Sequence, residues 1–301
     1  MNNPILAFSA SRLMLSVRTP LLITIYAFVL SLIGYFTIYA CFLRPAFTLR
    51  NMQQTLYGYM AILTLQFVLL VLVAPAMTAG SVSGERERQT LDLLLVTNMG
   101  AGRLVLGKLL ESFGFLALLA LSAMPVLSLA IVTGAAGLGQ VLAGVAFLLL
   151  TALLALCIGM FCSTLFKRTI TATVVSYLAV FGVGVLTLLP LIHDVKQISA
   201  MYDAMSYPGA AVTQIDYIPV AFVLNPALGL MALLQTQTGN IGNTMFQFSY
   251  TIGNTVSYMR YDLMYQYNMA VMAAASAVLT ALSALKMRMY RGGGMKGKRH
   301  A

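Results

Sequence analysis

The segment from Gly102 to Lys108 reads G-R-L-V-L-G-K and matches the first seven positions of the phosphate-binding loop G-x-x-x-x-G-K. Such a loop needs a Ser or Thr hydroxyl for magnesium at the next position, and this chain has Leu109 there. None of the 3 cysteines has a His or Cys partner at metal-ligand spacing, and the 2 histidines stand far apart. We therefore expect no bound cofactor, no metal site and no enzymatic activity in this chain.

A second segment with functional residue types runs from Ser83 to Val96 and carries charges of both signs. Its leucines recur at helical spacing while charged and polar residues fall on the other side, which predicts a short amphipathic helix over 83–98. Ser83 is expected to cap the first turn of this helix, where an acidic residue such as Glu85 is also favoured. Such a face either docks a partner through salt bridges or is merely solvated, and composition alone leaves both open.

The elements that must position these segments are membrane spans. Of the 301 residues, 60% are hydrophobic and 9% are charged, whereas soluble domains carry about 25% charged residues. The charges gather in clusters between long uncharged runs, and a spanning helix needs about 20 apolar residues. The expected fold class is therefore all-α, a polytopic membrane protein with six transmembrane helices. The predicted spans cover residues 19–43, 59–80, 105–133, 140–166, 169–192 and 263–286.

The lysines and arginines predict the direction of these spans. With both termini in the cytoplasm, 14 of the 18 basic residues lie on the cytoplasmic side, as the positive-inside rule requires. The net charge of +10 is then explained by helix flanks that contact membrane lipids, including the basic tail 287–301, and nucleic-acid binding is not expected. We expect a multi-pass protein of the plasma membrane of a bacterial cell.

Two segments outside the spans are expected to lie at the membrane surface. Residues 1–18 mix apolar and basic residues in a way that suits an interfacial helix, which serves either as a docking surface or as a membrane anchor. Residues 193–262 form an outer segment whose apolar part, 217–235, is interrupted by Pro219 and Pro226 and is too short to cross. This part is expected either to dip into the outer leaflet as a re-entrant element or to lie on that leaflet.

Polar residues within the spans either line a translocation path or serve helix packing, which is the commoner role of small and hydroxyl residues. The candidates for the path are Thr64, Gln66, Thr173 and Ser176. Glu111 is expected to pair with Lys108 one turn earlier, and Pro125 is expected to kink the third span. Since no Asp, Lys or Arg lies in the middle of a span, ion-coupled secondary transport is the weaker alternative.

The charged segment resembles a motif of a known family. Residues 84–95 read G-E-R-E-R-Q-T-L-D-L-L-L, and residues 103–110 read R-L-V-L-G-K-L-L. Together they are similar to the G-E-[RK]-E-x-G-T-L-[DE]-x-L-L and L-G-K segments of ABC-2 type transporter permeases, and the order of spans and loops is similar too. Gln89 stands where the family commonly has Gly, and it is expected to leave the helix intact.

The resemblance implies that the helix over 83–98 is a coupling helix, which docks in a groove on a cytoplasmic ATPase subunit. The residues implied in this coupling are Gly84, Glu85, Arg86, Glu87, Arg88, Thr90, Leu91 and Asp92. The resemblance further implies an exporter built from this chain, from separate ATPase subunits that bind ATP and magnesium, and from a second permease copy or a paralogue. The alternative within the same machinery is a mechanical transmitter or sensor that transports nothing.

Overall fold

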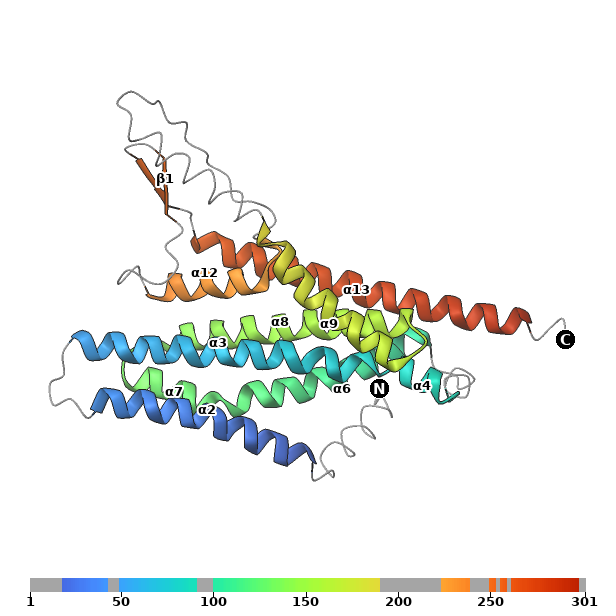
Figure 1. The fold of residues 1–301 in the computed structure, drawn as a ribbon, viewed down its shortest axis with the longest axis horizontal. Helices are drawn as coiled ribbons and strands as arrows, with labels where there is room; N and C mark the ends of the chain where they lie inside the picture. The colour runs from blue at the N-terminus through green and yellow to red at the C-terminus, as the bar shows by residue number, and fades with distance from the viewer. Residues whose placement is uncertain are drawn as a thin grey trace. The chain divides into compact units, whose positions relative to one another are not determined.

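The computed structural model describes residues 18–42, 49–90, 100–189, 223–238, 249–252, 255–258 and 261–297. Helices make up most of this part of the chain (Figure 1). They are α2 (Arg18–Phe42), α3 (Leu49–Ala79), α4 (Ser83–Glu87), α6 (Ala101–Ser122), α7 (Met124–Val132), α8 (Leu138–Leu165), α9 (Thr169–Leu186), α12 (Pro226–Thr238) and α13 (Tyr261–Gly297). Two antiparallel strands, β1 (Ser249–Ile252) and β2 (Thr255–Tyr258), add a short hairpin that the all-α expectation did not contain.

Five described helical segments are long and apolar enough to cross a membrane, by length and composition. They cover Leu56–Glu87, Gly102–Val132, Leu138–Leu165, Thr169–Leu186 and Met264–Tyr290. The predicted spans other than the first fall on these segments, which make the chain a multi-pass membrane protein. The first predicted span, 19–43, falls on α2, whose 25 residues extend about 37 Å at 1.5 Å per residue. Of the interfacial helix predicted over 1–18, residues 1–17 lie outside the described residues.

The chain divides into two compact units, one of residues 1–180 and 273–301 and the other of residues 181–272. In the first unit, α3 packs along α8 (Figure 1). Gly159 permits this contact, because a Cβ there would lie 2.3 Å from Thr78 Oγ1 and 3.3 Å from Pro75 Cα. Thr78 Oγ1 also donates a hydrogen bond across the contact to the Leu156 carbonyl oxygen, at 3.0 Å. Small residues that let two backbones approach are typical of helix packing in membranes.

The third span consists of α6 and α7, and the helix breaks between them at Ala123. The kink expected at Pro125 accounts for the break, because proline has no N–H to donate to the preceding turn. The Ala120 carbonyl oxygen is left with a long bond of 3.3 Å from the Ala123 N–H. The buried Gln66 of α3 donates its side-chain amide to the same oxygen at 3.0 Å, so a neighbouring helix satisfies the interrupted turn.

In the second unit, α12 has 13 residues and is about 20 Å long, too short for the roughly 30 Å core of a bilayer. Asn225 caps it, because its Oδ1 accepts a hydrogen bond from the Ala227 N–H at 2.9 Å. The Asn225 amide donates to the Gly184 carbonyl oxygen at 3.0 Å. Asn268 of α13 donates to the carbonyl oxygens of Val223 and Asn225, at 2.6 and 3.0 Å. Two buried asparagines thus hold the start of α12 against the end of α9 and the first turns of α13.

Candidate functional site

The residues implied in coupling, 84–92, begin on α4, a helix of 5 residues that follows α3 after a short turn. The helix ends before Gln89, which takes a φ of 57°, in the left-handed region that favours glycine. The expectation of one intact helix over 83–98 is therefore wrong at this point, and the glycine of the family motif has a conformational reason. Leu91 and Asp92 lie outside the described residues.

The start of α4 is fixed by a side chain from another helix. Ser163 Oγ on α8 accepts hydrogen bonds from the backbone N–H groups of Val82 and Ser83, at 2.9 and 3.0 Å. The prediction that Ser83 caps this turn is wrong, because its hydroxyl donates back to the Ala79 carbonyl oxygen at 2.8 Å. The N-terminal donors that a short helix leaves unpaired are thus satisfied across a contact with α8.

Glu85 forms an ion pair with Lys108 on α6. The Lys108 ammonium also donates to the Ser81 carbonyl oxygen, so one lysine holds both the turn after α3 and the first turn of α4. Both side chains are largely enclosed, with 17% of Lys108 and 25% of Glu85 exposed. The predicted pair between Lys108 and Glu111 is wrong, because the ammonium is directed at Glu85 instead.

Arg86 reaches the C-terminal end of α8. Its guanidinium donates to the carbonyl oxygens of Phe166 and Thr164, at 3.2 and 3.4 Å. A cation is favoured there, because the last carbonyl groups of a helix carry partial negative charge. Tyr290 of α13 also contacts the guanidinium, whose central carbon lies 4.9 Å from the ring centroid. Arg86 therefore connects α4 to both α8 and α13.

Glu87 reaches the N-terminal end of α9. Its Oε2 accepts hydrogen bonds from the backbone N–H of Thr169, at 3.2 Å, and from the Thr169 hydroxyl. A carboxylate is favoured at this position because the first N–H groups of a helix are unpaired and carry partial positive charge. Unlike Glu85, the Glu87 side chain remains exposed.

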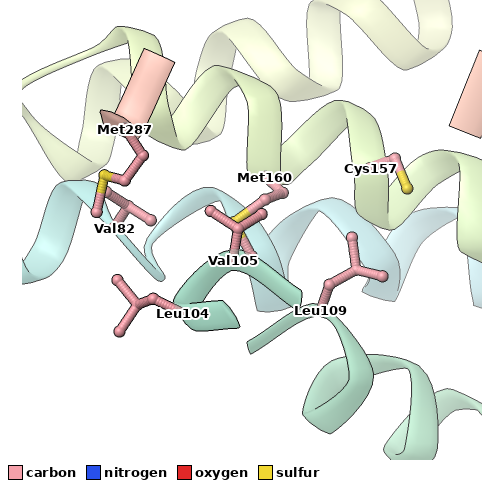
Figure 2. Packing of buried hydrophobic residues seen from close by; sticks show 7 residues of the cluster. All are labelled: Val82, Leu104, Val105, Leu109, Cys157, Met160 and Met287. Carbon is pink, nitrogen blue, oxygen red and sulfur yellow. The ribbon is translucent and has the colours of Figure 1, made fainter. Parts of the chain in front are cut away.

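We call Glu85, Arg86 and Glu87, with the groups they bind on α6, α8 and α9, the charged linkage. Figure 2 shows an apolar cluster from α6, α8, α13 and Val82, the residue that directly precedes α4. Its members are Val82, Leu104, Val105, Leu109, Cys157, Met160 and Met287. Because polar contacts and buried side chains both hold α4 to its neighbours, a displacement of α4 would move the start of α6, the end of α8 and the start of α9 with it.

Besides Glu87, the three described residues of the coupling segment that follow α4 are exposed, namely Arg88, Gln89 and Thr90, and we call these three the exposed turn. Thr90 closes it, because its N–H and hydroxyl donate to the Glu85 carbonyl oxygen at 2.9 and 3.2 Å. The interpretation that the charges of this segment are displayed to a partner therefore needs correction, since Glu85 and Arg86 bind helices of the same chain. Within the described residues, the surface that this segment offers to another protein is the exposed turn with Glu87.

Sequence reasoning missed Ser163, which binds the backbone at the start of α4, and it missed Thr169 and Tyr290, which contact Glu87 and Arg86. Thr169 carried a usable signal, because a threonine after Lys167 and Arg168 at the start of an apolar run is a common helix opening. Nothing in the local sequence marks the other two.

The four candidate path residues lie on α3 and α9. Gln66 and Ser176 are fully buried, at 0% exposure, whereas Thr64 and Thr173 are partly buried. Gln66 binds α6, as described above, and the hydroxyls of Ser176 and Thr173 donate to the carbonyl oxygens of Thr173 and Thr169, at 2.8 and 2.9 Å. These hydrogen bonds serve helix packing and the local backbone.

The segment that resembles a phosphate-binding loop, Gly102 to Lys108, belongs to the first turns of α6. It is helical and Lys108 is bound to Glu85 and Ser81, so it forms no loop around a phosphate. Among the described residues, no group of three or more His, Cys, Asp or Glu side chains could hold a metal ion.

A family model of ABC-2 family transporter proteins matches residues 44–285, which include α3 to α12 and most of α13. The apolar helices and this match define the class of protein, the membrane-embedded permease of an ABC transporter. The chain belongs to the ABC-2 family of transporter proteins. Membership implies a partnership with an ABC ATPase subunit. The chain matches none of the curated proteins with which it was compared.

Proposed function

We propose that this chain is the permease subunit of an ATP-driven exporter, and that the exposed turn and Glu87 receive the motion of a separate cytoplasmic ATPase. The charged linkage carries this proposal. The segment of α4 forms an ion pair with α6, hydrogen bonds to the end of α8 and a contact with the start of α9. A loop that is merely solvated needs none of these contacts. These contacts provide a mechanical route from a docked partner to the spans.

In this mechanism, the ATPase binds at Arg88 and Gln89. When ATP closes the ATPase pair, the ATPase pushes α4 in the direction parallel to the ATPase surface. Because α4 is too short to bend and is bound at both ends, it moves as a rigid piece. The push then reaches α9 through Glu87 and Thr169, and α8 through Arg86. The path between two permeases opens outward as these helices shift.

A second permease copy is supported by the surface of α9. Ile170, Val174 and Leu178 recur at helical spacing and are 78%, 53% and 66% exposed. Only 11% of the spanning window of α9 is buried within the chain, against 56% for α8. An apolar face of this kind suits the same face of a second copy, which gives a closed two-fold assembly.

We also propose six spans with both termini in the cytoplasm, α2 being the first span and α12 a re-entrant cap on the outer side. The length of α2 supports a crossing and the length of α12 argues against one. Reporter fusions at the two chain ends test this count, because an even number of spans places both ends on one side. Activity of a cytoplasm-dependent reporter at one end only would refute six spans.

Photo-crosslinking tests the docking surface. A benzoylphenylalanine at position 88 should form an adduct, in the native cell, with a polypeptide that carries the complete G-x-x-x-x-G-K-[ST] motif. The matched control is the same probe at Leu138, which is 62% exposed and lies at the start of α8, away from the exposed turn. The isolated chain should hydrolyse no ATP until that polypeptide is added. Adducts of equal yield at both positions, or hydrolysis by the isolated chain, would overturn the proposal.

A further inference from the structure

A groove of about 500 Å³ lies between α6, α8 and α13 in the first unit. Its wall on α13 consists of small side chains at helical spacing, and its other walls are mostly leucines. Representative lining residues are Leu106, Leu150, Leu153, Ala277, Ala281 and Ala284. Of the described residues that line it, none is Asp, Glu, His, Lys or Arg. An apolar cavity of this kind excludes water, so in a bilayer hydrocarbon is its natural occupant.

The dimensions of the groove match one leaflet. Its residues on α13 extend from Ala273 to Ala284, a stretch of 12 residues that spans about 16 Å, about half of the roughly 30 Å hydrocarbon core. One end is narrow, because a Cβ on Gly102 would lie 3.9 Å from the Ala284 Cβ. A helix of about 10 Å diameter and this length has a larger volume than the groove and could only lie across its opening. The groove therefore fits an acyl chain better than a helix of a second protein.

Basic side chains flank the narrow end. Arg288 lies four residues after Ala284 on α13, on the face that lines the groove, and Arg103 follows Gly102 on α6. Both are exposed, and neither makes an ion pair with a described residue. The acidic residue nearest on α6, Glu111, falls about half a turn away from the groove side of that helix. Among the described residues, the charge at this end is therefore positive, with no acidic side chain paired to Arg103 or Arg288.

We propose that this groove binds an anionic phospholipid, with one acyl chain between α6 and α13 and the phosphate group near Arg103 and Arg288. The proposal goes beyond the coupling function and rests on it only for the orientation that makes this the cytoplasmic leaflet. A bound lipid would contact Leu109 and Cys157, two members of the apolar cluster next to the charged linkage. The lipid thus supports the end of the bundle at which the ATPase acts.

The absence of tryptophan permits a direct test, since a single introduced tryptophan is the only one in the chain. L106W places the reporter at the groove, where Leu106 is 48% exposed. L282W is the matched control, because Leu282 is 42% exposed on α13 and does not line the groove. The full chain is reconstituted in phosphatidylcholine vesicles that contain a small fraction of either brominated phosphatidylglycerol or brominated phosphatidylcholine.

Half-maximal quenching of L106W should need at least about fivefold less brominated phosphatidylglycerol than brominated phosphatidylcholine, since one basic residue gives about this preference. The control should respond about equally to both lipids. Adding R103Q and R288Q to L106W should remove the preference. Equal quenching of L106W by both lipids, no quenching by either, or a preference that survives R103Q and R288Q would each overturn the proposal.

A second measurement avoids the tryptophan variants. Native mass spectrometry of the unaltered chain, purified from vesicles with equal amounts of both lipids, should show one retained phosphatidylglycerol. A277L fills the groove and should lose this lipid, whereas V278L, on the adjacent and 57% exposed position, should keep it. Equal retention by the two variants would contradict the groove as the site.

Discussion

Replacing Arg86 by Gln should destabilise the folded chain, whereas replacing Arg88 by Gln should not. The two arginines stand two positions apart in the same motif, but they differ in what they bind. Arg86 donates to two carbonyl oxygens at the end of α8 and contacts the Tyr290 ring. Arg88 is exposed in the turn after α4. A motif whose charges were all displayed to a partner would tolerate both substitutions equally.

The magnitude follows from these contacts. A hydrogen bond from a charged group contributes about 1.5 to 3 kcal/mol when well formed, and the two bonds of Arg86 are rather long, at 3.2 and 3.4 Å. The contact with Tyr290 adds about 0.5 to 1 kcal/mol, and Gln retains part of the donor capacity. We expect R86Q to lower the free energy of unfolding by about 2 kcal/mol, and R88Q to change it by less than about 0.5 kcal/mol.

Thermal unfolding in detergent, followed by loss of the monodisperse peak after heating, measures this difference. At about 1.6 °C per kcal/mol for a chain of 301 residues, R86Q should lower Tm by about 3 °C. R88Q should retain the Tm of the unaltered chain and lose stimulation of ATP hydrolysis when the ATPase subunit is added. Equal Tm values for R86Q and R88Q would refute the internal role that we assign to Arg86.

The same thermal assay tests three further residues. Q89G should raise the stability by about 0.5 to 1 kcal/mol, because Gly relieves the left-handed φ of 57°, and a lower Tm would contradict this. G159A should lower the free energy of unfolding by about 1 to 3 kcal/mol, since its Cβ would lie 2.3 Å from Thr78 Oγ1. The double variant G159A/T78A should lose less stability than the sum of the losses in the two single variants. Q66L should cost about 1 to 2 kcal/mol by removing the donor to the Ala120 carbonyl oxygen, and a Tm at or above that of the unaltered chain would exclude this role.

The positions of the long helices could be predicted from the sequence because their causes are local. A bilayer demands uncharged runs of a given length, so the interval between Glu111 and Lys167 had to hold two helices. Pro125 has no N–H, so it breaks the third span regardless of how the neighbouring helices pack. Pro226, which we expected only to interrupt the apolar part of the outer segment, instead opens α12, and Asn225 before it forms the cap.

The charged segment could be located from the sequence, but its role within the fold could not. Glu87 and Thr169 are separated by 82 residues, and Ser83 and Ser163 by 80, so no periodicity or spacing relates them. Helical spacing was extended through Gln89 because Gln is a good helix former, and the backbone adopts the left-handed conformation there against that propensity. Lys108 had one local candidate, Glu111, and a closer partner in space, Glu85.

The central claim is that the charged linkage transmits the motion of the ATPase to α9. Spin labels at position 171, an exposed position near the start of α9 outside the stripe of Ile170, Val174 and Leu178, report this motion as a distance between two permease copies measured by pulsed electron paramagnetic resonance. The three natural cysteines are replaced in this background. We expect a non-hydrolysable ATP analogue to shift the distance in the complex, and T169A, which removes the hydroxyl that donates to Glu87 and leaves the docking surface unaltered, to reduce the shift while the ATPase stays bound. A full-size shift in T169A, or no shift in the unaltered complex, would contradict the account.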